Sequence, residues 1–505
     1  MMKKILLVLV LFIEVITLSV SAQDTAISYW GEPFNMKGTL TSSYKRHKAG
    51  TPLTIQGIVF RKENNKKPAI LALIDSTQLY VPLRDSYIFA IEPKNAAEFW
   101  QSIALKCGMY QYFAKKGYRN SFRKELSNES QDYLTRLKDI DYRDNYVNDF
   151  VQSNFAAAYS VSIDPYRAEH LTVRVIASPE PDTFMLPNGT MVVSSGLLCT
   201  LDSEDELTAI ITNEMCHYLL DHQLDNVVRA EAHSRHAAFW GMFLGQLTNA
   251  ALDAAINSDH NNNVAAGIAV ASGIGTIVSL ANVKDVNRLG MNYTLEQDAL
   301  ADSVATCFLQ LKGMNVNALP SALYKIRQFY ESQNVTKGIP RYVSCKWLTN
   351  RLNSLGGCDS VLVSPTYLKA TANVVTSNAR MYLDDKRYDY AEQLIRKNIK
   401  NGLADSQDYV ILAQAKMNTT VTNESDEECL KLLDKAQEIS TTTNMDIFRP
   451  RIQLLMRLSR KDEATNVMQQ YADALDNYSK QLRDNQKEAE WVKSEKGWLD
   501  SLKQR

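Results

Sequence analysis

The chain has 505 residues, of which 45% are hydrophobic, and this is enough for a large core and more than one domain. Its 56 Lys and Arg residues nearly balance 57 Asp and Glu residues, so the formal net charge is -1. This balance argues against nucleic acid or an anionic membrane surface as the main partner.

The N-terminus has the pattern of a secretory signal. Lys3 and Lys4 precede an apolar run from residue 5 to 20, and small residues follow up to Ala22. This order predicts export of the chain and removal of residues 1–22. A retained membrane anchor is the alternative, but no charged flank follows the apolar run.

A small β-module is predicted over residues 51–92, after a polar linker over residues 23–50. The runs that resemble strands are 53–60, 69–74 and 78–83. The polar residues 62–67 suit a hairpin loop between the first two. The pattern does not indicate a ligand, so we interpret the module as a structural cap on a larger domain.

Helices and a short sheet are predicted next. Apolar residues recur at helical spacing over residues 95–158, while residues 171–177 alternate as a half-buried strand does. Pro187, Asn188 and Gly189 form a turn signal between two further strand-like runs.

Residues 203–222 predict one helix, and Ser203 with Glu206 forms a capping box at its start. Inside it, Asn213, Glu214 and His217 have the spacing of H-E-x-x-H, with asparagine in place of the first histidine. Histidines four residues apart share one helical face and can hold one zinc ion, while the glutamate activates a metal-bound water. Only half of that histidine pair is present. The helix therefore belongs either to a working metallopeptidase or to the scaffold of one.

Two apolar segments follow at residues 237–256 and 264–281. The second is long enough for a short membrane span. Gln246, Asn249 and Asp253 in the first would make a spanning hairpin costly. We therefore expect small-residue helices that pack on the core or lie at a membrane face, with membrane spanning as the alternative.

A further helix is predicted over residues 294–312, ending at Gly313. Asp298 and Asp302 lie four residues apart on one of its faces. On an isolated surface helix such a pair would be only a solvated acidic stripe.

The C-terminal part, residues 365–505, contains a weak helical repeat. The small residues Ala391, Cys429 and Ala464 recur at intervals of 38 and 35 residues, near the period of tetratricopeptide-type hairpins. An irregular helical bundle is the alternative, and it would lack the binding groove of such repeats.

The seven cysteines are too few and too scattered for a disulfide scaffold. In an oxidising compartment Cys345 and Cys358 are candidates for a pair across a loop with two glycines. The other cysteines suit the role of small apolar residues.

From Asp182 to His222 the sequence resembles metallopeptidase family forty-eight, the HtpX and CAAX prenyl protease family of gluzincins. The ordered set that carries this resemblance is 182–189 (hairpin), 195–198 (turn), 204–207 (helix start), 213–217 (motif) and His222. The resemblance implies an α+β, mainly α fold with a gluzincin-type domain over residues 95–340. The β-module and the tetratricopeptide-like helical domain flank this domain.

The resemblance also implies roles for single residues. Glu214 matches the general base, and His217 matches a ligand of the one zinc ion. Asp298 takes the third ligand position with a shorter carboxylate, and Asn213 takes the degenerate first position. Asp302 matches the aspartate that orients a ligand.

Substitute zinc donors are present near the motif. They are Cys216, His222, His233 and His236. Packing is the preferred interpretation for Cys216, because a single side chain near a motif is more often structural than a ligand.

In gluzincins an edge strand beside the zinc helix aligns an extended substrate by main-chain pairing. The matching residues here are Met185, Leu186, Met191 and Val192. Two functions follow as expectations. The first is a periplasmic zinc endopeptidase that acts on unfolded envelope polypeptides, and the second is an inactive, chaperone-like scaffold that binds them. Either one would recruit a protein partner through the C-terminal repeats, and peripheral membrane contact is compatible with both.

Overall fold

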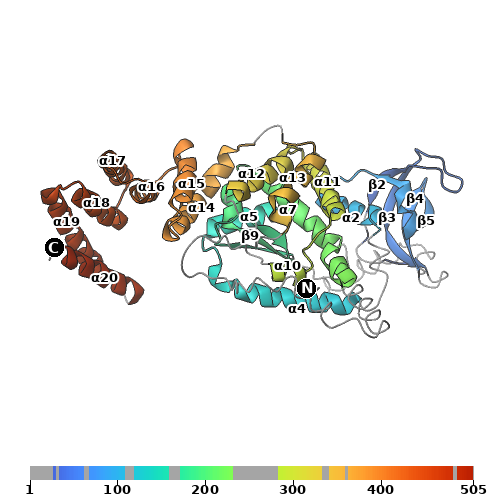
Figure 1. Ribbon diagram of the computed structural model, residues 1–505. Coiled ribbons are helices and arrows are strands. Elements are labelled where there is room, and N and C mark those ends of the chain that lie inside the picture. The colour runs from blue at the N-terminus through green and yellow to red at the C-terminus, as the bar shows by residue number, and fades with distance from the viewer. Residues whose placement is uncertain are drawn as a thin grey trace, which may run out of the picture.

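The computed structural model describes residues 27–29, 33, 35–61, 67–108, 119–158, 171–230, 283–332, 341–358, 362–481 and 486–503. Within these ranges the chain is α+β and mainly helical, with a β-module at one end and a helical domain at the other (Figure 1). The predicted signal, the two apolar segments, His233 and His236 lie outside the described residues. Among the described helices, none combines the length and the apolar character that crossing a membrane requires.

The β-module is one antiparallel sheet with strand order β5-β4-β3-β2-β6, and β1 pairs with β3. Its strands are β1 (Ile27–Tyr29), β2 (Met36–Leu40), β3 (Pro52–Arg61), β4 (Pro68–Ile74), β5 (Thr77–Pro82) and β6 (Phe89–Ile91). Strands β1 and β2 fall in the stretch that the sequence assigns to a polar linker. The reason is that Met36 and Leu40 are buried at both ends of β2, although the residues around them are polar.

The central domain begins with helices and a three-stranded sheet. The helices are α2 (Ala96–Lys106), α4 (Arg119–Arg136) and α5 (Asn145–Ala158). The strands β7 (Thr172–Ile176), β8 (Thr183–Met185) and β9 (Thr190–Ser194) have the order β7-β9-β8, so β8 is an edge strand. The turn between β8 and β9 needs glycine, because Gly189 has a φ of +87° and a Cβ there would lie 2.8 Å from Leu171.

Helix α7 (Glu204–Leu219) is the centre of this domain and packs against α5, α11, α12 and β8. The surrounding helices are α6 (Ser195–Thr200), α10 (Val283–Arg288), α11 (Leu295–Lys312), α12 (Ala318–Ser332) and α13 (Cys345–Ser354). As predicted, α11 ends at Gly313, whose φ is +67°. One hydrophobic cluster runs from Met36 in the β-module to Val375, so the module shares its core with the central domain.

None of the seven cysteines, all of which lie in the described ranges, forms a disulfide, so the candidate pair Cys345 and Cys358 is not bonded. Helix α13 begins at Cys345 and runs for 10 residues towards Cys358. A helix of that length spans about 15 Å, which carries the chain away from Cys345 before Cys358 is reached.

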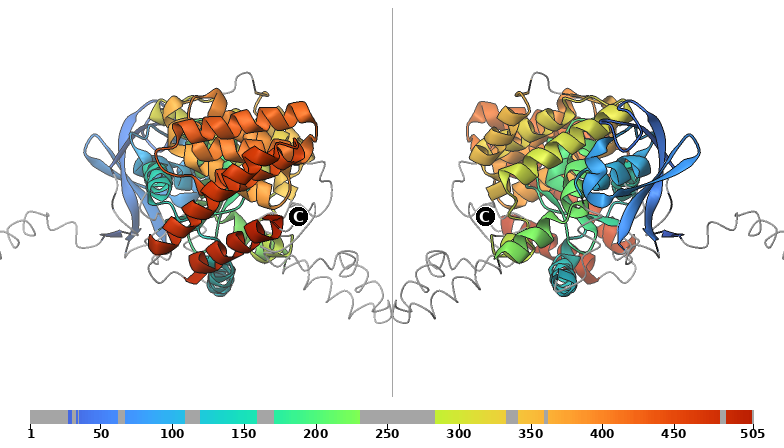
Figure 2. Two further views of the ribbon diagram at one scale, coloured as in Figure 1. Left: turned by 90° about the vertical axis from the view of Figure 1, so that its left-hand side faces the viewer. Right: turned by 90° about the vertical axis from the view of Figure 1, so that its right-hand side faces the viewer.

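The C-terminal domain is a row of helices that pack on one another in chain order. They are α14 (Pro365–Asp384), α15 (Tyr388–Lys400), α16 (Ser406–Thr419), α17 (Asn423–Ile439), α18 (Phe448–Arg457), α19 (Lys461–Gln481) and α20 (Gln486–Lys503). Ala391, Cys429 and Ala464 are all buried, as expected of small residues at close helix crossings. Figure 1 shows this row extending away from the central domain, so its helices lie in front of that domain in the end-on view of Figure 2, left; the row is attached through α14, which packs on α5 and α6.

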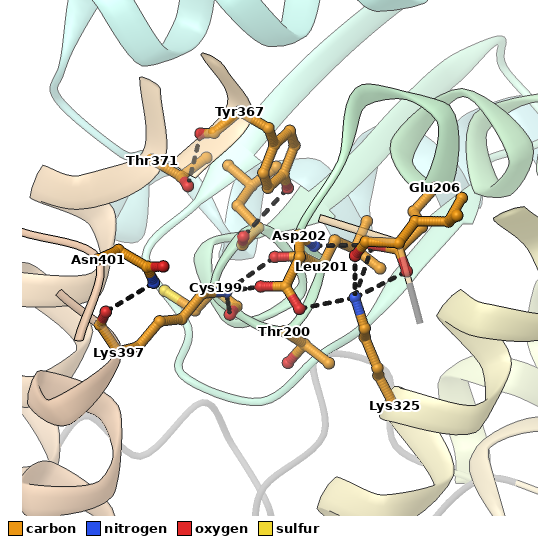
Figure 3. A network of polar contacts seen from close by, with 12 residues as sticks. Cys199, Thr200, Leu201, Asp202, Glu206, Lys325, Tyr367, Thr371, Lys397 and Asn401 are labelled. Carbon is orange, nitrogen blue, oxygen red and sulfur yellow. Dashed lines mark hydrogen bonds and ion pairs between the residues drawn. The ribbon is translucent and has the colours of Figure 1, made fainter. Parts of the chain in front are cut away.

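A network centred on Asp202 joins the two domains (Figure 3). Lys325 of α12 and Lys397 of α15 contact its two carboxylate oxygens at 2.7 and 2.5 Å. Burial opposes ionisation of Asp202, but the two lysines outweigh it and lower its pKa. Glu206 takes part as well, because its carboxylate accepts the Asp202 N–H at 2.7 Å and pairs with Lys325 instead of closing the predicted capping box.

Lys397→Met should weaken the attachment of α15. Lys397 also donates to the carbonyls of Cys199 and Leu201, at 2.7 and 2.9 Å, and methionine leaves both without this donor. We expect a loss of about 1–3 kcal/mol in the free energy of unfolding, measured in urea. The matched control is Lys400→Met on the exposed end of the same helix. Equal losses in the two variants would contradict this role.

Candidate functional site

Helix α7 carries the motif residues and is almost wholly buried. Ser203 caps its start, since its Oγ accepts the Glu206 N–H at 3.2 Å. Helix α11 packs along α7 and brings Asp298 and Asp302 to the motif. The two helices thus assemble residues that are far apart in the sequence.

Asn213 is held in a buried polar network. Its Nδ2 donates to Asp302 Oδ1 at 2.8 Å, and its Oδ1 accepts from Arg351 Nη2 at 3.2 Å. Arg351, on α13, also holds the Asp302 carboxylate with two N–H groups, at 2.5 and 3.1 Å. All three side chains are at most 8% exposed. The amide of Asn213 is therefore occupied at both ends.

His217 lies between a carboxylate and a second histidine. Its Nε2 is 3.4 Å from Asp298 Oδ1, and its Nδ1 is 2.9 Å from His222 Nδ1. Tyr293 stacks on its ring, with 3.7 Å between the ring centroids. Burial and the neighbouring His217 lower the pKa of His222 to about 3, so His222 is neutral and its ring orients His217.

Both carboxylate oxygens of Asp298 have a partner. Oδ1 faces His217, and Oδ2 accepts the indole N–H of Trp347 at 2.5 Å. Burial raises the pKa of Asp298, but Arg351, His217 and Trp347 outweigh it and hold the pKa below its usual value. Asp298 is thus an ionised carboxylate in a buried site.

Glu214 faces strand β8. Its carboxylate lies near the backbone N–H of Met185, and its Oε2 is buried with no hydrogen-bond partner among the described residues. Burial raises the pKa of this carboxyl group, while His217 and Arg351 act in the opposite direction. Glu214 therefore makes a structural contact in the place where a general base would stand.

The fold agrees with the comparison with known protein families. Residues 148–368, from within α5 to the start of α14, match the family model of Peptidase family M48. The central domain resembles the M48 metallopeptidases. No curated protein matches the chain. The match ends just inside α14, whose residues Tyr367 and Val375 complete the core of the M48 domain.

M48 peptidases use zinc, and two of the donors in this M48 domain fit that ion. Donors about 2.0–2.1 Å from a tetrahedral zinc lie about 3.3 Å apart, close to the 3.4 Å between His217 Nε2 and Asp298 Oδ1. The described residues offer no third donor, because the Asn213 oxygen already accepts from Arg351. Within the described ranges, no three His, Cys, Asp or Glu side chains form a group suited to a metal. The residues present do not fit a catalytic zinc site.

The substitute donors do not complete the set. Cys216 is fully buried in the hydrophobic core of the M48 domain, where burial and then Cys107 raise the pKa of its thiol. His222 contacts His217 through Nδ1 and so supports that ring. His233 and His236 lie outside the described residues.

The predicted substrate strand is present, but its side chains are inaccessible. Met185, Leu186, Met191 and Val192 are all 0% exposed. An extended polypeptide would meet only main-chain groups here. At Met185 the carbonyl already accepts from Gln223, and the N–H faces the Glu214 carboxylate.

Several residues of the site do not follow from the motif. They are Tyr293, Trp347, Arg351 and Gln223. Arg351 had a detectable signal, because it lies with Leu348 and Leu352 on the buried stripe of α13. An arginine within an apolar stripe indicates a buried anionic partner.

Asp182 makes the stability of the M48 domain depend on pH. Its carboxyl group is buried beside the Tyr342 hydroxyl, and burial raises its pKa to about 8. An unfolded aspartate releases its proton near pH 4, so between about pH 4 and 8 the folded chain binds more protons. The free energy of unfolding therefore falls as pH rises through this window.

Asp182→Asn should remove this contribution, because the amide can still accept from Tyr342 and does not ionise. Urea unfolding at pH 5, 6.5 and 8 measures how fast the free energy of unfolding falls with pH. In Asp182→Asn this fall should be smaller than in the natural chain by up to about 1.4 kcal/mol per pH unit. The exposed Asp75→Asn serves as control. A variant with the natural slope would show that Asp182 is ionised in the folded chain.

Proposed function

We propose that this chain is a non-hydrolysing M48-type protein that binds unfolded or partly assembled polypeptides in the periplasm. The observation that carries the proposal is Asn213. Its amide stands in a ligand position, is bonded to Asp302 and Arg351, and leaves two donors where a catalytic zinc requires three. Without zinc the site lacks the source of both the nucleophile and the electrophile of M48 chemistry.

Binding is supported by the architecture beside the M48 domain. A cavity of about 750 Å³ lies where the M48 domain meets the first helices of the C-terminal domain. Its lining combines aromatic side chains and amides with charged groups, including Phe329, Tyr382, Tyr390, Gln328, Gln393, Asp202, Lys325, Glu331 and Lys397. A mixture of aromatic and hydrogen-bonding groups suits the side chains and main chain of a polypeptide. The helical row provides a second surface for a protein partner.

Export is the remaining part of the proposal. It rests on the signal pattern of residues 1–22. The cysteines are compatible with it, because none of the seven takes part in a disulfide.

A zinc endopeptidase is the second candidate, and the spacing of His217 and Asp298 favours it. In that function Glu214 would serve as the base. This candidate requires a third donor that replaces Asn213.

Metal analysis and a paired assay decide between the two. The mature chain and Glu214→Gln are incubated with casein, and binding is measured with reduced, carboxymethylated lactalbumin, which stays unfolded. We expect no retained zinc, no cleavage and equal binding by both proteins. Stoichiometric zinc, with cleavage lost in Glu214→Gln, would overturn the proposal in favour of the peptidase.

A further inference from the structure

Strand β8 is an edge whose outward main-chain groups can be identified from its register. Ser194 N–H donates to the Asp182 carbonyl, and Leu186 N–H donates to the Thr190 carbonyl. The even-numbered residues therefore bond to β9. Thr183 and Met185 turn their N–H and C=O groups away from the sheet, towards the position of an added strand.

The chain's own side chains occupy this position. The Met185 carbonyl accepts from Gln223 Nε2, and the Met185 N–H faces the Glu214 carboxylate. In an antiparallel pair, a hydrogen-bonded residue exchanges these same two bonds with one residue of its neighbour. Glu214 and Gln223 thus replace one residue of a neighbouring strand.

Gln223 is held firmly in this place. It is 3% exposed and lies at the start of the helical segment 222–230. Asp221, with a φ of +59°, makes the sharp turn before it and pairs with Arg123. On the other side, a Cβ at Gly290 would lie 2.3 Å from the Gln223 carbonyl, so the two backbones are in close contact.

We propose that Glu214 and Gln223 form an autoinhibitory contact that closes the edge of β8 to an extended polypeptide until Gln223 is withdrawn. The closure itself depends only on the contacts of Met185. That the excluded molecule is a client polypeptide rests on the proposed function. Because the edge accepts only main-chain pairing, an extended segment of any sequence with free N–H groups can compete for it.

The closure is tested first by hydrogen exchange of the Met185 amide, followed by NMR on ¹⁵N-methionine-labelled protein. Glu214→Gln keeps an oxygen that can accept the Met185 N–H, so protection should persist. Glu214→Ala removes the acceptor, and exchange should become at least about tenfold faster. Equal exchange in the natural chain and Glu214→Ala would overturn the closure.

Binding is tested with a fluorescein-labelled octapeptide in which threonine alternates with valine and lysine. Its control has proline at every second residue and cannot pair along an edge. We expect Gln223→Ala to bind the first peptide at least about tenfold more tightly than the natural chain and not to bind the control. Circular dichroism verifies that the variant is folded.

Equal affinity of the natural chain and Gln223→Ala would overturn the autoinhibitory role, and so would equal affinity for both peptides. Cleavage of the octapeptide would contradict the proposed function. It would not contradict the closure of the β8 edge, because hydrogen exchange of the Met185 amide tests that closure separately.

Discussion

The double variant Asn213→His with Asp298→Glu should retain about one zinc ion per chain after purification and dialysis, whereas the natural chain retains none. The reason is that most of a zinc site is already built. His217 is oriented by His222, and its Nε2 lies 3.4 Å from the carboxylate of Asp298. An imidazole at position 213 supplies the missing donor on the same helical face.

The residues around position 213 also favour zinc binding by the double variant. In the natural chain Asp302 accepts from the Asn213 amide. In the variant the same carboxylate can accept from the N–H of the new imidazole and so orient its ring. Arg351 would still hold Asp302 through its two other contacts. The longer side chain at position 298 reaches towards the metal and away from Trp347.

Metal content by mass spectrometry is the measurement, with Asn213→Gln combined with Asp298→Glu as the matched control. The control keeps an amide at position 213 and should retain no zinc. Stoichiometric zinc in the natural chain would show that another donor completes the site. Failure of a folded double variant to bind zinc would show that α7 and α11 are not placed as an M48 site requires.

Arg351→Met should cost about 3–5 kcal/mol in the free energy of unfolding. Arg351 is 8% exposed, and its guanidinium holds both oxygens of Asp302, which is 2% exposed. It also stabilises the charge of the nearby Asp298. Methionine keeps much of the side-chain volume but leaves two buried carboxylates without their cation.

A second substitution separates the charge effect from packing. When Asp302→Asn is added to Arg351→Met, the buried negative charge is removed and most of the lost stability should return. Urea unfolding of the natural chain, the two single variants and the double variant gives the coupling energy. A loss below about 1 kcal/mol in Arg351→Met would mean that water or another group compensates Asp302.

Local patterns predicted the helices well. Ser203 predicted the start of α7, and Gly313 predicted the end of α11, because caps and left-handed glycines depend on a few adjacent residues. The turn before Gly189 was predicted for the same reason. In contrast, Glu206 left its predicted capping contact, since Lys325 from a distant helix offers the buried carboxylate an opposite charge.

The sequence by itself determined most of the elements of the central domain and the M48-type motif with asparagine in its first position, although it missed β1 and β2. Its resemblance to the M48 family predicted Glu214, His217, Asp298 and Asp302 as site residues. Only the tertiary structure decided what these residues contact. Asp302 is 89 residues from Asn213, and Arg351 is 138 residues from it. Contacts over such separations are set by how α7, α11 and α13 pack, and local periodicity carries no information about that packing.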